Sequence, residues 1–421
     1  MHERTALPGG PRVISAQLPG TRSLSVAVHV PAGARHEADA EAGIAHFLEH
    51  VTFRGTPGWP TSRAVAEAVE GAGGTSNAAT DRESTVYWVR LPVRDAALAI
   101  RVLADLVVRP LLADDAIERE REIIVEEIRS YRDDPAQHVL TLADGAWFGA
   151  GPMGREIAGD EDGVRALTPA AIRAFWQRGY APGGLVVAAA GDLPHARIVE
   201  LVAEAFGTGP ADPPRATPAA GPLPHRRVVT EARATAQAHL CIAYPGLPRD
   251  DPDQWVMELL VTILGDGSSS RLFLGVREDA GLAYDISAWQ TDHADAGTIS
   301  IYAGVAPSDL GRAIRAILAE VARLRDGGVP AAELAKAQRY LIGRLELRLE
   351  ESRALAAWLG TQEALHDRVH TLDAAVAALS AVRADDIARL AGRLLGDDGL
   401  ALTAIAPRTA RRGIERHLRP A

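Results

Sequence analysis

Two histidines and a glutamate stand close together in the stretch His46-Phe47-Leu48-Glu49-His50. On an α-helix, residues four positions apart lie on one face, about 40° apart and with roughly 6 Å between their Cβ atoms. The imidazoles of His46 and His50 can therefore converge on one metal ion. Glu49 shares that side of the helix, so its carboxylate can reach a water molecule held by the same metal.

This spacing, H-x-x-E-H, is the inverted form of the zinc-metallopeptidase signature. A catalytic Zn²⁺ has three protein ligands and one open position, so two histidines and one carboxylate suit it better than a structural site. Zinc lowers the pKa of bound water to about 7. Glu49 is then the candidate base, which takes a proton as water attacks a carbonyl and returns it to the leaving amine.

A long acidic helix, expected over residues 114–132, offers the third ligand. At ~100° per residue, its apolar stripe comprises Ile117, Ile124, Ile128 and Tyr131. Glu120 and Glu127 fall on the flank of that stripe, whereas the side chains of Glu118, Glu122 and Glu126 point toward water. Burying an unpaired carboxylate costs several kcal/mol, so Glu120 and Glu127 are expected to meet a metal or a cation, with Glu127 as the third ligand.

The composition limits the class of protein. The chain has 421 residues, a net charge of −10, 47% hydrophobic residues and one cysteine, Cys241. An acidic chain without a basic face is not expected to bind nucleic acid, and one cysteine excludes an internal disulfide. We find neither a signal peptide nor an apolar run of about 20 residues, which predicts a soluble cytoplasmic protein with no membrane partner.

The order of predicted strands and helices recurs along the chain. We expect an N-terminal domain over 1–206, a proline- and glycine-rich linker over 207–224 and a second domain over 225–421. In the second half, a helix at 253–264 takes the place of the 43–53 helix but lacks the H-x-x-E-H spacing. This predicts an internal duplication with one functional half.

The chain resembles the M16 (pitrilysin) family of zinc peptidases, in particular its mitochondrial-processing-peptidase-like members. The resemblance is carried by three segments of the first half, of which the first contains the motif, and by three of the second: 35–55, 76–87, 117–121, 271–273, 277–278 and 281–284. It implies that His46, His50 and Glu127 are the ligands of one Zn²⁺ per chain, that Glu49 is the base, and that Glu120 supports the ligands. It also implies that Arg277 and Tyr284 form a pair that reaches the substrate.

The fold implied by this resemblance is α+β, with two homologous tandem domains, each a mostly antiparallel sheet covered by helices (the LuxS/MPP-like metallohydrolase fold). Chains of this length pair into dimers that enclose a chamber, as a homodimer or as a heterodimer with an M16-like partner. The peptide substrate is expected to add as a strand along the edge formed by Thr75, Ser76, Asn77, Ala78 and Ala79. Whether Arg277 and Tyr284 serve the zinc of their own chain or of a partner stays open.

Three functions compete at this stage. The first is a zinc endopeptidase acting on peptides or unfolded segments, which includes a leader or precursor processor working with a partner chain. The second is a non-catalytic M16-like scaffold, which the intact motif disfavours. The third is another hydrolase with the same motif, such as an S-ribosylhomocysteinase, but those chains are much shorter and need a catalytic cysteine, and Cys241 lies in the wrong half.

Overall fold

The computed structural model describes residues 2–209, 219–220, 227–366, 368–396, 399–411, 414 and 416. Two compact units divide the chain, each with one sheet and a covering of helices. Unit 1 comprises Met1–Ile128, Glu156–Pro218 and Leu345–Thr371, and unit 2 comprises Arg129–Arg155, Ala219–Arg344 and Leu372–Ala421. Each unit is described by itself below.

The sheet of unit 1 has the strand order β1-β2-β6-β3-β5-β4. Its strands are β1 (Glu3–Ala6), β2 (Arg12–Gln17), β3 (Ser23–Val30), β4 (Thr75–Thr80), β5 (Thr85–Pro92) and β6 (Val186–Gly191). Only β2 and β6 pair in parallel, and the other pairs are antiparallel. Strand β4 pairs with β5 alone and therefore forms one edge, as expected for residues 75–79.

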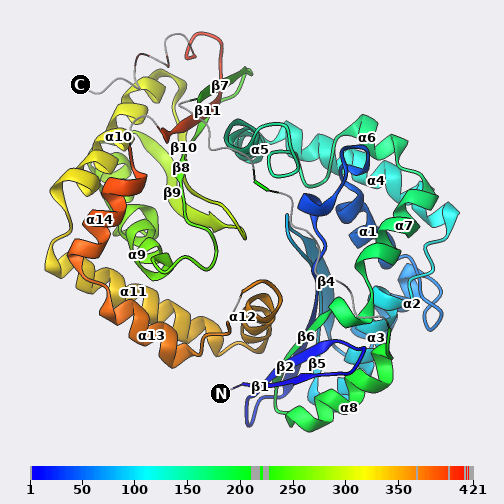
Figure 1. The fold of residues 1–421 in the computed structure, drawn as a ribbon. Helices are drawn as coiled ribbons and strands as arrows, with labels where there is room; N and C mark the ends of the chain where they lie inside the picture. Colours follow the sequence, from blue (N-terminus) through cyan, green and yellow to red (C-terminus); the bar gives the residue numbers. More distant parts are fainter. Residues whose placement is uncertain are drawn as a thin grey trace. The chain divides into compact units, whose positions relative to one another are not determined.

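The helices of unit 1 cover both faces of this sheet (Figure 1). They are α1 (Ile44–Thr52), α2 (Ser62–Glu70), α3 (Ala96–Val108), most of α4 (Asp114–Asp133), α6 (Glu161–Ala166), α7 (Pro169–Gly179), α8 (His195–Phe206) and α12 (Ser352–Leu365). The main core lies on one face, where Val26 and Val28 of β3, Tyr87 and Val89 of β5 and the buried side chains of α1 belong to one apolar cluster. The opposite face packs against α12.

Unit 2 repeats this topology. Its sheet has the order β7-β11-β8-β10-β9, with one parallel pair between β7 and β11. The strands are β7 (Arg227–Ala232), β8 (Ala238–Pro245), β9 (Ala283–Asp292), β10 (Gly297–Val305) and β11 (Ala401–Ala406). Numbered within each repeat, both sheets run 1-5-2-4-3 when β1 is left out, so the predicted duplication and the α+β fold class are confirmed.

One helix of unit 2 is equivalent in topology to the motif helix of unit 1. They are α5 (Pro135–Phe148), α9 (Gln254–Gly265), a π-helical turn (Phe273–Asp279), α10 (Leu310–Gly327), most of α11 (Ala331–Leu349), α13 (Leu372–Ala381) and α14 (Ala384–Leu394). Helix α9 follows β8 as α1 follows β3, and it buries an apolar surface with no histidine. None of the helices in the described residues is long and apolar enough to cross a membrane.

The units differ from the contiguous halves expected from the sequence in two segments. Helix α5 belongs to the first half of the chain but packs on β8 and β11, and α12 belongs to the second half but packs on β3 and β6. Each helix buries apolar residues against the other repeat's sheet, which neither propensity nor periodicity reveals. The linker expected at 207–224 falls largely on residues outside the described ranges.

Candidate metal centre and active site

Helix α1 carries the motif, and its start is fixed by two features. Gly43 precedes the helix at φ 88°, where a side chain would be strained and would also meet the backbone of Ala158. The buried carboxylate of Glu37 then accepts hydrogen bonds from the backbone N–H groups of Gly43 and Ala45, both at 2.9 Å. A carboxylate at the N-terminus of a helix also interacts favourably with the helix dipole. Glu37 therefore anchors the turn that holds His46.

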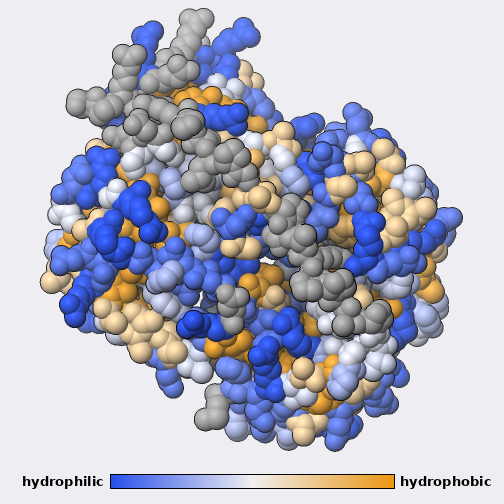
Figure 2. Space-filling view, in the orientation of Figure 1, coloured by the Kyte–Doolittle hydropathy of each residue, from blue (hydrophilic) through white to orange (hydrophobic). Residues whose placement is uncertain are grey.

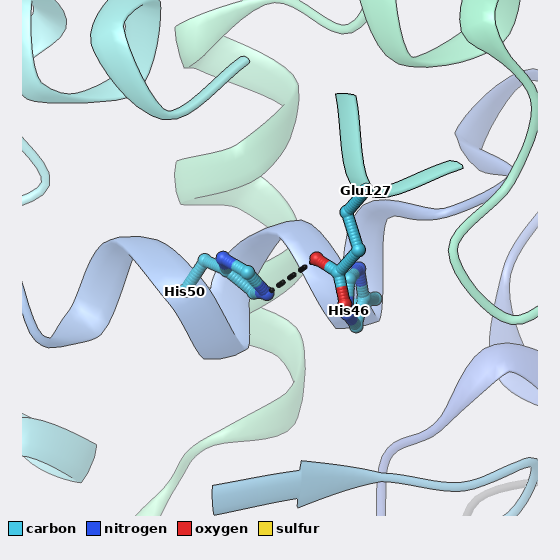
Figure 3. Close-up of side chains that lie close together, drawn as sticks. All are labelled: His46, His50 and Glu127. Carbon is cyan, nitrogen blue, oxygen red and sulfur yellow. Dashed lines mark ion pairs between the residues drawn. The ribbon is translucent and has the colours of Figure 1, made fainter. Parts of the chain in front are cut away.

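The two histidines and Glu127 come together as the sequence predicts (Figure 3). Glu127 Oε2 lies 3.3 Å from His50 Nε2, and Glu127 Oε1 lies 3.8 Å from His46 Nε2. The three donor atoms all fall within 4.8 Å of one another. Zn–ligand bonds of about 2.0–2.2 Å place tetrahedral ligand atoms roughly 3.3–3.6 Å apart, so this group fits a zinc ion after small movements.

Glu120 supports this group of candidate metal ligands through its contact with His50. Its side chain is 2% exposed, and its Oε1 lies 3.0 Å from His50 Nδ1 while its Oε2 forms an ion pair with Arg54. This contact to the far nitrogen of His50 directs Nε2 toward Glu127, as is usual for a histidine that binds metal. Burial alone would raise the pKa of Glu120, but the hydrogen bonds to His50 and Arg54 hold it below its usual range.

The two histidines titrate in opposite directions. Burial and the neighbouring His50 lower the pKa of His46 to about 4. Burial also disfavours protonated His50, but hydrogen bonds to Glu120 and Glu127 outweigh it and raise its pKa to about 9. In the metal-free fold, the stabilisation from protonated His50 is full below about pH 6.5 and is lost as the pH rises through 9.

Glu49 lies on the side of α1 that carries the two histidines, as the helical spacing predicts. It is half-buried, and its Oε2 accepts a hydrogen bond of 2.5 Å from Thr80 Oγ1 on the edge strand β4. Burial raises the pKa of Glu49, and the hydrogen bond from Thr80 partly offsets that rise. A carboxylate with a raised pKa, next to residues that could hold a metal ion, is suited to accept and release protons near neutral pH.

A cavity of about 400 Å³ opens beside this edge strand. Helix α2 and strand β4 form its walls, with Val65 and Val69 as apolar lining, Phe53 from the end of α1, and Glu70 as the acidic member. Thr75, Ser76 and Asn77 also line the cavity, while Ala78 turns into the core and Ala79 is exposed. The predicted substrate edge therefore has space for side chains along it.

Arg277 and Tyr284 come together in unit 2, as the resemblance implied. The Arg277 guanidinium lies over the rings of Phe273, at 4.7 Å, and Tyr284, at 5.8 Å. Tyr284 is 74% exposed at the start of β9, so its hydroxyl is open to a ligand. Their role toward a substrate stays a prediction.

The helical periodicity predicts the burial of the glutamates of α4 correctly, but it is wrong for Tyr131. Glu120 is buried, Glu127 is half-buried, and the remaining three glutamates are exposed. Tyr131, predicted in the buried stripe, is instead 38% exposed, because it lies beyond Ile128, where the packing of α4 on unit 1 ends.

Three residues that support the site were missed from the sequence: Glu37, Arg54 and Thr80. Strand alternation could have found Thr80, since positions 76, 78 and 80 of β4 share one face. Arg54 stands four residues after His50, a spacing that places it beside the same carboxylate. No sequence signal identifies Glu37, whose role depends on a turn between two short helical segments.

Sequence profiles of one protein family match both halves of the chain. A sequence profile described as insulinase (peptidase family M16) matches residues 12–161, and one described as peptidase M16 inactive domain matches residues 166–341. The second match covers most of the repeat that lacks the motif.

Whole-length relatives carry zinc-protease names. An uncharacterized zinc protease of Streptomyces coelicolor is 36% identical over 93% of this chain and 87% of its own, and one of Bacillus subtilis is 31% identical over 97% and 98%. A probable mitochondrial-processing peptidase subunit beta of Arabidopsis thaliana is 29% identical over 96% of this chain and 78% of its own. The crystal structure of a protease from Helicobacter pylori has the same fold, with a TM-score of 0.89 at 22% identity over 97% of this chain and all of that one.

The contact between Glu120 and His50 can be tested in the metal-free protein. We expect Glu120→Gln to lower the pKa of His50 from about 9 toward 6.5, by about one unit or more, because the amide keeps the shape but loses the charge. Histidine-labelled NMR titration measures this pKa. Glu122→Gln, an exposed change on the same helix, should leave it in place, and an unshifted His50 in Glu120→Gln would show that the carboxylate does not hold the ring.

Proposed function

This chain belongs to the peptidase M16 family, and on that premise we propose that it is a zinc-dependent endopeptidase that hydrolyses peptides or unfolded segments. The observation that carries the proposal is the convergence of His46, His50 and Glu127 beside Glu49 and an open edge strand. Two histidines and one carboxylate leave a position for substrate or water, which a structural zinc site does not.

His46, His50 and Glu127 would hold the ion. Bound there, zinc supplies a Lewis acid that polarises a peptide carbonyl and makes water more acidic. Glu120 keeps the His50 ring oriented through its contact with Nδ1, and Arg54 neutralises the buried carboxylate. Glu49 accepts a proton from the attacking water and passes it to the leaving amine, since its raised pKa suits both steps.

Strand β4 would hold the substrate. Its outer edge has no strand partner in the described sheet, so a peptide can add there through main-chain hydrogen bonds. The hydrogen bond from Thr80 joins this strand to Glu49 on α1, and so fixes the base relative to the strand that would pair with the peptide. Main-chain pairing selects extended or unfolded segments over a particular sequence. Arg277 and Tyr284 are proposed to contact the bound peptide, Tyr284 as a donor to the developing oxyanion.

We also propose that two chains pair, as a homodimer or with an M16-like partner, and that the enzyme acts in the cytoplasm. The similarity to a relative named as a subunit of a processing peptidase supports pairing. It also supports one alternative within the same class, a leader or precursor processor that needs a partner chain. A non-catalytic scaffold finds less support, because every motif residue is present and in contact.

Peptide cleavage tests the proposal. We expect the chain to cut an unstructured quenched-fluorescence peptide of about 15–25 residues, long enough to pair as a strand. A chelator should abolish the activity, and Glu49→Gln should lower kcat by about 10²–10⁴-fold with unchanged zinc content, because it removes the base and no ligand. Glu126→Gln, an exposed change on α4, is the control. Zinc binding without any cleavage would instead favour the scaffold, or a processor that lacks its partner.

The hydrogen bond from Thr80 to Glu49 has its own test. Thr80→Val keeps the shape of the side chain but removes the donor, so we expect kcat to fall about tenfold, the effect of losing roughly 1.4 kcal/mol from a hydrogen bond to a carboxylate. KM, zinc content and thermal stability should stay close to those of the wild type. Thr80→Ser should restore kcat, and a wild-type kcat in Thr80→Val would mean that Thr80 does not position the base.

A further inference from the structure

Helix α12 covers only part of its face of the unit 1 sheet. It packs on β2, β6 and β3, where Leu359 lies in an apolar cluster with Ile14 and Val186. Gly360 allows this close approach, because a side chain there would collide with the ring of His29. The neighbouring strand β5 turns Val86 and Trp88 to the same face, and both are only half-buried.

A cavity of about 260 Å³ lies beside α12 over β3 and β5, away from the metal centre's face of the sheet. Its lining includes Val86, Trp88, Arg348, Arg353 and Ala357. Pockets for drug-sized ligands measure about 300–1,000 Å³, so this cavity suits a smaller group, such as one large amino-acid side chain. Its walls are mostly apolar, and its charged members are both arginines.

The two arginines have capacity to bind an anion. The Arg353 guanidinium lies 5.0 Å from the centre of the Trp88 ring, which holds it in place and leaves its N–H edge for another group. Its ion pair with Glu351 is long, at 3.9 Å, whereas Glu351 is closer to Arg90, at 3.1 Å. Arg348 is exposed and forms no ion pair within the described part of the chain.

An apolar cavity lined by two arginines matches a ligand with one carboxylate and one apolar side chain. Guanidinium groups bind carboxylates through paired N–H donors, and Trp88, Val86 and Ala357 offer an apolar wall. We propose that this pocket binds the C-terminal residue of a peptide, with its apolar side chain in the cavity and its free α-carboxylate between Arg348 and Arg353. The choice of a peptide as ligand rests on the proposed function.

The position of the pocket agrees with this ligand. Trp88 and Val86 pair directly with Asn77 and Ala79 of the edge strand β4. Neighbouring strands are about 4.8 Å apart, so a peptide added to β4 lies only two strand spacings from β5, and a few further residues reach the pocket. The enzyme would then favour peptides with a free apolar C-terminus, as released by another protease, over internal loops of intact chains.

Binding to the Glu49→Gln variant, which should hold peptides without cutting them, tests the pocket independently of catalysis. The probe is an N-terminally fluorescein-labelled, unstructured peptide of about 15 residues that ends in phenylalanine, compared by anisotropy with its C-terminal amide. We expect the amide to bind about tenfold more weakly, because it loses a charge-assisted contact. A peptide ending in glycine should also bind more weakly.

Substitutions assign the effect to this pocket. Arg348→Gln should remove the preference for the free acid, whereas Arg339→Gln, an exposed change of equal charge on the same helix, should keep it. Ala357→Leu, which fills the cavity without altering charge, should weaken binding of the phenylalanine peptide. Equal binding of acid and amide, a preference that survives Arg348→Gln, or no binding of either peptide overturns the inference. A wild type that cleaves nothing while the acid preference holds would overturn the proposed function alone.

Discussion

The candidate metal centre depends on the contacts of the buried Glu120 carboxylate. A carboxylate that is 2% exposed needs hydrogen-bond and charge partners, and it finds them in the His50 ring on α1 and in Arg54, two residues after the end of α1. The contact with Nδ1 also sets the direction of the His50 ring, so one buried carboxylate on α4 orders a candidate metal ligand on α1. Removing both partners would leave an uncompensated buried charge, and such a loss costs about 3–5 kcal/mol. The positions of Glu120 and Glu127 on α4 are therefore explained by the groups that these carboxylates contact, and not only by solvation.

A second constraint ties the candidate metal centre to the proposed substrate edge. Thr80 is the last residue of the edge strand, and its hydroxyl contacts Glu49 on the helix that carries both histidines. A peptide that pairs with β4, as proposed, would thus meet a strand already fixed relative to Glu49. Because the sheet supports both elements, preorganisation comes from secondary structure and not from a mobile loop.

Much of the site could be predicted from the sequence, because its residues lie on helices with clear periodicity. His46, His50 and Glu49 follow from spacing, and Glu120 and Glu127 follow from their place beside an apolar stripe. The duplication also showed in the order of elements. The exchange of α5 and α12 between the units could not be predicted, because it depends on long-range packing that no local pattern encodes. Glu37 was missed for a different reason, since its carboxylate caps α1 across a local turn that has no recognisable sequence pattern.

The central claim is that this chain holds zinc through His46, His50 and Glu127, and the most direct measurement is metal content together with zinc X-ray absorption on the purified, zinc-loaded protein. The account predicts a single tightly bound zinc with nitrogen and oxygen ligands at about 2.0–2.2 Å, including two imidazoles and no sulfur. His46→Gln and Glu127→Gln should each lower the zinc content sharply, whereas Glu49→Gln should not. Zinc that stays bound in both ligand variants, or a spectrum with sulfur ligands, would contradict the account.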